Sequence, residues 1–254
     1  MYYLAEPAVS YYIEDNDDAI LFDTGYSDVF LRNAEKMGID LNKVSHIVLS
    51  HGHNDHSGGL PYLKKEGKRF KLVAHPSAFV KREDDTGLSI GSPLNEETIR
   101  KCFDLSTQED PYRISEHLLF LGQIRKKLPF EKSYAIGKKY VDGTALEDRI
   151  EDDSALVYKG KDGLFIITGC SHAGICSIIE QAKEVCGENK ILGVIGGFHL
   201  FDVDERLHKT IDYFEENGIR SLYPCHCVSL AAKIEMGKRL PIHEVGVGLE
   251  LEIE

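Results

Sequence analysis

Four side chains that bind metal ions in proteins stand within six residues of this chain, in the run His51-Gly-His53-Asn-Asp55-His56. His51 and His53 are two residues apart, so extended backbone would point both rings to the same side. Asp55 and His56 come next and can reach a second point nearby. Neutral imidazole and carboxylate groups suit zinc, iron or manganese. The spacing therefore predicts one or two bound metal ions, and we expect zinc, with iron or manganese as alternatives.

Such a site predicts hydrolysis. A bound metal ion lowers the pKa of water from ~15.7 to about 7, which makes hydroxide available at neutral pH. Between two ions about 3.5–4 Å apart, this hydroxide can attack a phosphorus or carbonyl centre. We expect Asp55 to act in catalysis as well as in metal binding, because it would orient the nucleophile. The expected substrate is a small-molecule phosphoester, ester or lactone.

The elements around the run must hold it in place. A short apolar segment directly before it predicts a buried strand, and Gly58 and Gly59 after it let the chain turn into a helix. Each half of the chain contains a hairpin, a polar turn rich in metal-ligand types, and then helix and strand, which suits a two-sheet core covered by helices. We predict strands at 9–13, 19–22, 44–49, 70–74, 117–121, 154–158, 164–167, 191–195 and 220–223, and helices at 29–37, 58–65, 96–102, 175–186, 204–217 and 229–236.

One segment is less regular than the rest. Residues from about 82 to 140 mix a polar loop with a short helix and a strand. We interpret residues 1–254 as a single domain with an insertion at about 82–140. The insertion is either a lid over the core or an ordinary surface connection, and the sequence favours neither.

The histidine run and its surroundings resemble the metallo-β-lactamase superfamily. The pattern H-x-H-x-D-H after a buried strand is the signature of that superfamily, and here it lies within Ser50–Leu60. Phe22–Gly25, which reads FDTG, is similar to its first motif, whose aspartate supports the metal loop. The resemblance implies a mixed α and β fold, a four-layer αββα sandwich, with the metal ions held by this loop.

Further segments resemble a narrower group of the superfamily. That group contains bacterial metal-dependent hydrolases and the archaeal 7,8-dihydropterin-6-methyl-4-(β-D-ribofuranosyl)-aminobenzene-5'-phosphate synthase, a dihydropteroate-synthase-like enzyme of methanopterin biosynthesis. The resemblance implies that His172 and His226 are metal ligands too, with His226 on the second metal. The segments are Thr168–Ile175, Gly196–Leu200 and Pro224–Cys227, together with 122–125 and 130–131 in the insertion.

The chain departs from the superfamily pattern at two places. Many members have a histidine just before the second hairpin, where this chain has Glu151–Ser154, and a bridging aspartate after that hairpin, where this chain has Cys170. Asp153 and Cys170 are therefore candidates for additional metal ligands. A thiolate at Cys170 would favour zinc over manganese. A bridging carboxylate reduces the repulsion between two cations, so its loss predicts a weaker second site.

Three further residues are candidates for catalysis or for substrate binding. His199 is a candidate catalytic residue, which would stabilise an oxyanion or protonate a leaving group. Metal coordination, a substrate contact and a role at the strand end are alternatives for it. Arg125 and Lys138, or Lys139 in place of Lys138, are candidate phosphate-binding residues if the insertion folds over the site.

Three classes of function fit these residues. The first is hydrolysis by metal-activated water. The second, implied by the archaeal enzyme, is a pterin-related condensation that releases pyrophosphate. The third is a ligand-sensing module without turnover, against which the intact run of four ligand types argues. Redox chemistry at a di-iron centre is a minor fourth class, because it usually needs a flavin partner domain.

Composition limits the classes of binding partner and the cell compartments that we expect for this protein. A formal net charge of −12 argues against general affinity for nucleic acid or anionic membrane. A phosphorylated small-molecule substrate remains compatible, because a metal ion reverses the local field. No window approaches the ~18 apolar residues of a membrane span, and the N-terminus lacks a signal-peptide pattern. The six cysteines read as reduced thiols, so we expect a cytoplasmic protein, whose oligomeric state the sequence leaves open.

Overall fold

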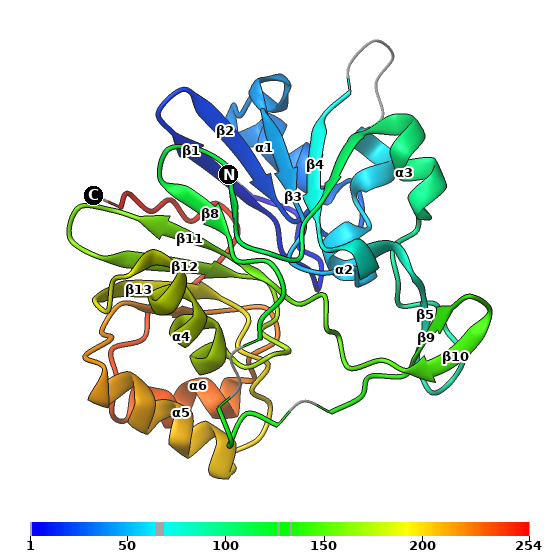
Figure 1. Ribbon diagram of the computed structural model, residues 1–254. Helices are drawn as coiled ribbons and strands as arrows, with labels where there is room; N and C mark the ends of the chain where they lie inside the picture. Colours follow the sequence, from blue (N-terminus) through cyan, green and yellow to red (C-terminus); the bar gives the residue numbers. More distant parts are fainter. Residues whose placement is uncertain (1, 64–68, 126–127, 133, 254) are drawn as a thin grey trace. The chain divides into compact units, whose positions relative to one another are not determined.

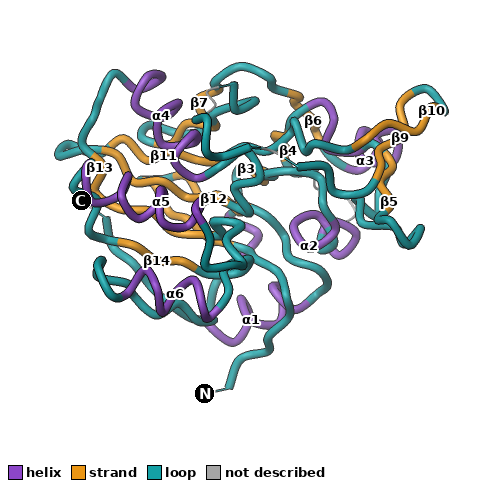
Figure 2. Tube along the Cα trace, turned by 90° about the horizontal axis from the view of Figure 1, so that it is seen from below, coloured by secondary structure: helices purple, strands orange, loops and turns teal. Residues whose placement is uncertain are grey.

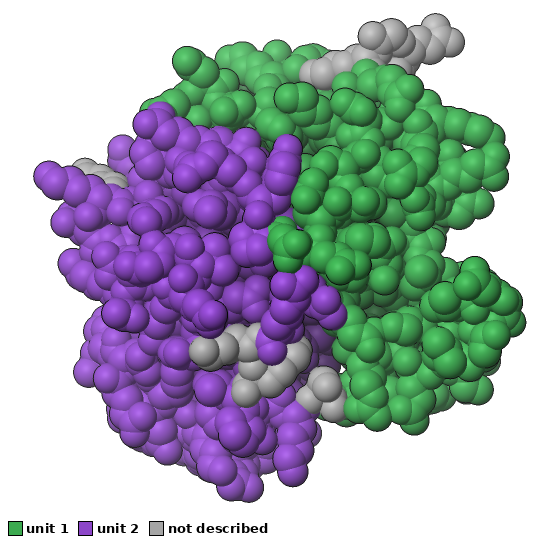
Figure 3. Space-filling view, in the orientation of Figure 1, with its two compact units in different colours: residues 1–110, 134–152 green, residues 111–133, 153–254 purple. Residues whose placement is uncertain are grey.

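The computed structural model describes residues 2–63, 69–125, 128–132 and 134–253. The chain falls into two compact units, and each has its own large sheet and its own apolar core. Unit 1 consists of Met1–Asp110 and Tyr134–Asp152, and unit 2 consists of Pro111–Ser133 and Asp153–Glu254 (Figure 3).

The large sheet of unit 1 brings two motifs to one edge. The first two strands form an antiparallel hairpin, and the other neighbouring strands are parallel. The second and third strands therefore end at the same edge, where they are followed by Asp23 and by Ser50–His51. In order across the sheet, the strands are β1 (Tyr11–Asp15), β2 (Asp18–Phe22), β3 (His46–Val48), β4 (Lys71–Ala74) and β6 (Asp104–Thr107) (Figure 1).

The helices of unit 1 have clear end signals in the sequence. Helix α1 (Val29–Met37) ends at Gly38, whose φ of 75° lets its N–H donate to the carbonyls of the last turn. Helix α3 (Glu96–Cys102) begins after Asn95, whose side chain accepts from the Thr98 N–H. A third helix, α2 (Asn54–Ser57), is a single turn inside the histidine run. Shorter 3₁₀ turns span 41–43, 60–63 and 76–79.

The sheet of unit 2 also contains parallel strands that end at one edge, here three of them. Its order is β14 (Leu222–Pro224), β13 (Ile191–Gly196), β12 (Leu164–Thr168), β11 (Ala155–Lys159), β8 (Leu118–Phe120) and β7 (Tyr112–Arg113). β12, β13 and β14 are mutually parallel, so Cys170, His199 and His226 all follow strands that end at one edge. Helix α4 (Ile175–Cys186) packs on β11 and β12, and α5 (Glu205–Glu216) contacts both α4 and α6 (Leu230–Gly237) (Figures 1 and 2).

The segment 82–140, predicted as an insertion, is distributed over three sheets. Its strand β6 belongs to the large sheet of unit 1, and its strand β8 belongs to the sheet of unit 2. A small separate sheet in unit 1 joins β5 (Lys81–Glu83), β9 (Lys138–Val141) and β10 (Thr144–Glu147). Figures 1 and 2 show β9 and β10 as a hairpin that projects from unit 1. The interpretation of residues 82–140 as an insertion or a lid stays a prediction.

The local sequence signals located most elements correctly. Helices at 29–37, 96–102 and 175–186 are confirmed at both ends. The predicted helix at 58–65 is wrong, because the chain already turns at 54–57 and then forms the 3₁₀ turn at 60–63; Lys64 and Lys65 lie outside the described residues. Gly58 and Gly59 serve close packing instead, since a Cβ at either would collide with the carbonyl oxygen of Tyr26 or Thr24. Within the described ranges, no helix combines the length and the apolar character that crossing a membrane requires.

A buried glutamate caps helix α4 from a distant part of unit 2. One Glu131 oxygen accepts from the Cys176 N–H at 2.9 Å, and the other accepts from the Ser177 N–H at 2.7 Å and the Ser177 hydroxyl at 2.6 Å. These are N–H groups that the first turn of a helix leaves without a partner inside the helix. Gly174 must be glycine here, because its φ is 102° and a Cβ would collide with the Glu131 carboxylate.

The substitution Glu131→Ala should therefore destabilise unit 2. It removes hydrogen bonds to a charged acceptor and leaves buried N–H groups unsatisfied, so we expect a loss of about 2–3 kcal/mol in the free energy of unfolding. The matched control is Asp204→Ala, which removes the exposed side-chain cap of α5 and should cost about 1 kcal/mol. Urea unfolding of both variants measures the difference. A Glu131→Ala variant no less stable than Asp204→Ala would contradict this account of the cap.

Candidate metal centre

The two histidines of the run that are closest in sequence converge on one point. His51 and His53 are buried, and His51 Nε2 lies 3.0 Å from His53 Nδ1. One ligand atom each from His51, His53 and Asp55 lies within 4.8 Å of the others. An ion with tetrahedral bonds of about 2.0–2.1 Å holds two ligand nitrogens roughly 3.3 Å apart. The spacing and chemistry of these donors fit a metal ion of the predicted kind.

Asp55 and His56 form a second pair in the same loop. Their facing atoms, His56 Nε2 and Asp55 Oδ2, are 3.5 Å apart, and the His56 ring packs 4.2 Å from the His51 ring. His56 is fully buried, whereas a quarter of the Asp55 side chain is exposed. Asp55 therefore combines a carboxylate beside the imidazoles with access to solvent, and its catalytic role stays a prediction.

Asp23 supports this loop from the end of β2, as the resemblance implied. One oxygen accepts from the Ser50 N–H at 2.7 Å, and the other accepts from the Ser50 hydroxyl at 2.8 Å and contacts His56 Nδ1 at 2.7 Å. An ionised carboxylate only accepts, so His56 carries a proton on Nδ1 and its Nε2 is left to face Asp55. This arrangement fixes the ring orientation and keeps Nδ1 protonated, so a metal ion could bind His56 only through Nε2.

The two halves of the loop differ in electrostatic environment. Burial lowers the pKa of His56, but the carboxylates of Asp55 and Asp23 outweigh it and raise the pKa well above its usual value. Burial, with the Arg82 charge second, lowers the pKa of His53 to about 4. At neutral pH His53 is therefore a neutral imidazole, which is the form that binds metals.

The predicted site residues of unit 2 lie in turns with unusual backbone. The rings of His172 and His199 are 4.5 Å apart, so the structure brings these two predicted residues together. Ser171, His199 and His226 have φ values of 59°, 49° and 53°, in the left-handed region that non-glycine residues rarely adopt. Strained backbone of this kind gathers at functional sites. The role of His172 and His226 as metal ligands stays a prediction.

The two candidates for additional ligands are both buried in unit 2. Asp153 accepts from the Ala173 N–H at 2.8 Å through one oxygen, so it supports the turn that contains His172. The Cys170 carbonyl accepts from the Cys227 thiol. Metal coordination by Asp153 or by the Cys170 sulfur stays a prediction.

The predicted phosphate-binding residues lie in different units. Arg125, in unit 2, is exposed, and its backbone N–H donates to the Gln181 side chain. Lys138 is exposed on β9 of unit 1, where it pairs with Glu83 across the small sheet, and Lys139 forms an ion pair with Glu151. Their role in binding phosphate stays a prediction.

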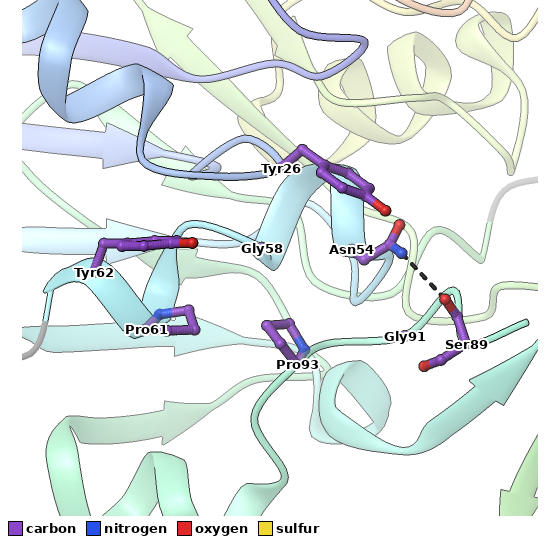
Figure 4. Close-up of a pocket in the computed structure, with 8 residues that line it drawn as sticks. All are labelled: Tyr26, Asn54, Gly58, Pro61, Tyr62, Ser89, Gly91 and Pro93. Atoms are coloured by element: carbon purple, nitrogen blue, oxygen red, sulfur yellow. Dashed lines mark hydrogen bonds between the residues drawn. The ribbon is translucent and has the colours of Figure 1, made fainter.

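A hollow of about 340 Å³ lies on unit 1 beside the histidine run. Asn54, the residue between His53 and Asp55, turns its side chain there and donates to the Ser89 carbonyl at 3.2 Å (Figure 4). The size falls within the range of small-ligand pockets. The sequence gives no sign of this hollow, because its walls come from three separate stretches of the chain: Tyr26, then Asn54, Gly58, Pro61 and Tyr62, and then Ser89, Gly91 and Pro93.

Comparisons with known proteins agree on one family. The family model described as the metallo-beta-lactamase superfamily matches residues 4–183. An uncharacterized protein of Methanocaldococcus jannaschii is 33% identical over 239 residues, which cover 93% of this chain and 89% of the relative. The 7,8-dihydropterin-6-methyl-4-(beta-D-ribofuranosyl)-aminobenzene-5'-phosphate synthase of the same organism is 36% identical over 227 residues, which cover 84% of this chain and 76% of the relative. The crystal structure of Tm1679, a metal-dependent hydrolase of the beta-lactamase superfamily, matches with a TM-score of 0.80 and 31% identity, over 94% of this chain and 93% of that one.

The substitution Asp23→Asn should weaken metal binding. The amide nitrogen would donate to His56 Nδ1 and so move the ring proton to Nε2, the nitrogen that faces Asp55. We expect the zinc dissociation constant to rise about 10- to 100-fold, as is typical when a carboxylate that orients a ligand histidine is changed. Competition with a chromophoric chelator measures it, with Asp28→Asn, next to α1, as the control. Unchanged zinc affinity in the Asp23→Asn variant would refute the role given to Asp23.

Proposed function

Because the chain belongs to the metallo-β-lactamase superfamily, we propose that it is a metal-dependent hydrolase of a small-molecule phosphoester, ester or lactone. Its mixed α/β architecture, with several sheets and helices, matches the metallo-β-lactamase fold, which confirms the predicted fold class. The observation that carries the proposal is the convergence of His51, His53 and Asp55 at the end of one strand. The superfamily consists mostly of hydrolases, and the similarity to Tm1679 supports the same reaction class here.

The residues of the histidine run hold the metal in this proposal. His51, His53, Asp55 and His56 are its ligands, and the group-specific motifs add His172 and His226 from unit 2. A bound zinc ion supplies an electrophile that polarises a substrate oxygen and makes coordinated water acidic. Asp55, which is partly exposed, orients the attacking water. Cys170 supports zinc over manganese as the native ion, because thiolate is a soft ligand.

Three side chains and a hollow are our candidates for contacts with the substrate. His199, packed on the His172 ring, is our candidate to stabilise an oxyanion or to protonate the leaving group. Arg125 and Lys138 are candidates to bind a phosphate. The hollow beside Asn54 offers the tyrosines Tyr26 and Tyr62, both about half exposed, to a small substrate.

Composition supports the proposed cell compartment and the proposed type of partner. None of the six cysteines, all of which lie in the described part of the chain, forms a disulfide bond, and this supports a cytoplasmic location. The net charge of −12 supports a small molecule rather than nucleic acid or a membrane surface as the partner.

One relative favours a second candidate function. The protein of M. jannaschii that is 36% identical to this chain is named a synthase of a pterin-linked aminobenzene phosphate. A related condensation, with release of pyrophosphate, would use the same ligands. Reaction in ¹⁸O-labelled water separates the candidates: label in the product means hydrolysis, and a new C–N bond without label transfer means condensation. A sensing module without turnover is opposed by the complete ligand run.

Removal of metal should abolish activity. We expect phosphodiesterase or lactonase activity of the purified protein to disappear after dialysis against a chelator and to return when zinc is added, because His51, His53, Asp55 and His56 would then lack their ion. The control is the far-ultraviolet circular dichroism spectrum, which should show that the metal-free protein stays folded. Full activity after complete removal of metal would overturn the proposal.

A further inference from the structure

We propose that Asp152, held by the buried arginine Arg82, is a positioning residue that sets the distance between the ligands His51 and His53. The inference rests on the proposed metal binding. It concerns a carboxylate that is not itself a ligand: both of its oxygens are already used inside unit 1. The family motifs do not point to either residue.

Arg82 is the anchor of this arrangement. It lies on β5 and is 1% exposed, which is rare for an arginine. Its guanidinium donates through Nε to Asp148 Oδ2 and through Nη2 to Asp152 Oδ1, both at 2.6 Å. Nη2 and Nη1 also donate to the carbonyls of Ser77 and Ala78, at 3.2 and 3.5 Å. The planar fork of arginine thus holds two buried carboxylates in fixed directions.

The second oxygen of Asp152 reaches the metal loop. Asp152 Oδ2 accepts from the Gly52 N–H at 2.8 Å, and Gly52 is the residue between His51 and His53. The peptide that separates the two ligands is therefore tied to a rigid charged group 100 residues away in the chain. This bond holds the backbone at the point where a rotation would change the 3.0 Å distance between His51 Nε2 and His53 Nδ1.

The loop also packs directly against the anchor. A Cβ at Gly52 would collide with the Ala78 carbonyl oxygen and with Arg82 Nη1. Gly52 is therefore required for close approach, and the loop cannot move towards Arg82 without a clash. Hydrogen bond and packing together leave Gly52 little freedom before any metal binds. Such preorganisation of the ligands should appear as higher metal affinity.

Asp148 provides a matched control within the same cluster. Both aspartates are fully buried, both accept from Arg82 through one oxygen, and both accept from a backbone N–H through the other. The two aspartates differ in the residue that donates this N–H. Asp152 accepts from Gly52 of the metal loop, and Asp148 accepts from Ile150 at 3.1 Å. An asparagine has one acceptor oxygen, so Asp152→Asn and Asp148→Asn each lose one of two equivalent bonds and one charge.

The test compares zinc affinity in the wild-type protein and these two variants by chelator competition. We expect Asp152→Asn to raise the zinc dissociation constant at least tenfold and Asp148→Asn to raise it less than threefold, as orienting groups typically contribute 10- to 100-fold. In the zinc-free protein, the Gly52 amide should exchange with solvent faster in Asp152→Asn than in Asp148→Asn. A purely structural cluster would make the two variants alike.

The outcomes separate this inference from the proposed function. A wild-type protein that does not bind zinc overturns both. Tight wild-type binding with equal affinity in the two variants overturns only the positioning role of Asp152. If Asp152→Asn does not fold, Arg82→Lys takes its place, because a single ammonium group cannot hold both carboxylates in the directions of the fork. Unchanged zinc affinity in a folded Arg82→Lys variant would equally overturn the inference.

Discussion

The carboxylate of Asp23 accepts hydrogen bonds from the backbone N–H and the hydroxyl of Ser50, and it contacts Nδ1 of the His56 ring. A carboxylate with no exposure to water is tolerated only when its oxygens are satisfied, so β2 cannot end where it does unless the loop after β3 folds around it. The same bonds that satisfy Asp23 orient His56. The local stability of the loop and the orientation of His56, a proposed metal ligand, therefore depend on one buried carboxylate.

In both units, candidate site residues directly follow parallel strands that end at the same edge of a sheet. In unit 1, Asp23 follows β2 and His51 follows β3; in unit 2, Cys170, His199 and His226 follow β12, β13 and β14. The turns after these strands contain non-glycine residues in the left-handed region, among them Asp23 at φ 58° and His199 at φ 49°. Such conformations cost energy and persist only where surrounding contacts enforce them. Their position directly after the strands that carry the motifs fits sites selected for function rather than for stability.

Features that depend on neighbouring residues could be predicted from the sequence, and those that depend on distant partners could not. The ligand run is a local pattern, and helices such as 29–37 and 175–186 have apolar periodicity and glycine at their ends. Arg82, by contrast, stands in a charged stretch that looks exposed, and its partners are 66 and 70 residues away. Asp152 stands in a stretch marked in the sequence only by the lack of an expected histidine, and Glu131 stands in a motif that does not indicate a helix cap. The strands β5, β6, β9 and β10 are polar and mostly exposed, so no apolar run marks them in the sequence. Strands β3 and β8 are as short, but they stand in apolar runs that predict them.

In the proposed function, the loop from His51 to His56 binds a metal ion through the atoms that already face one another. Anomalous diffraction from zinc-loaded crystals, recorded on both sides of the zinc edge, tests it most directly. We expect a zinc peak about 2.0–2.1 Å from His51 Nε2 and His53 Nδ1, with Asp23 and Asp152 outside bonding distance. A zinc peak that avoids these two nitrogens, or crystals soaked with zinc that show no peak in this loop, would contradict it.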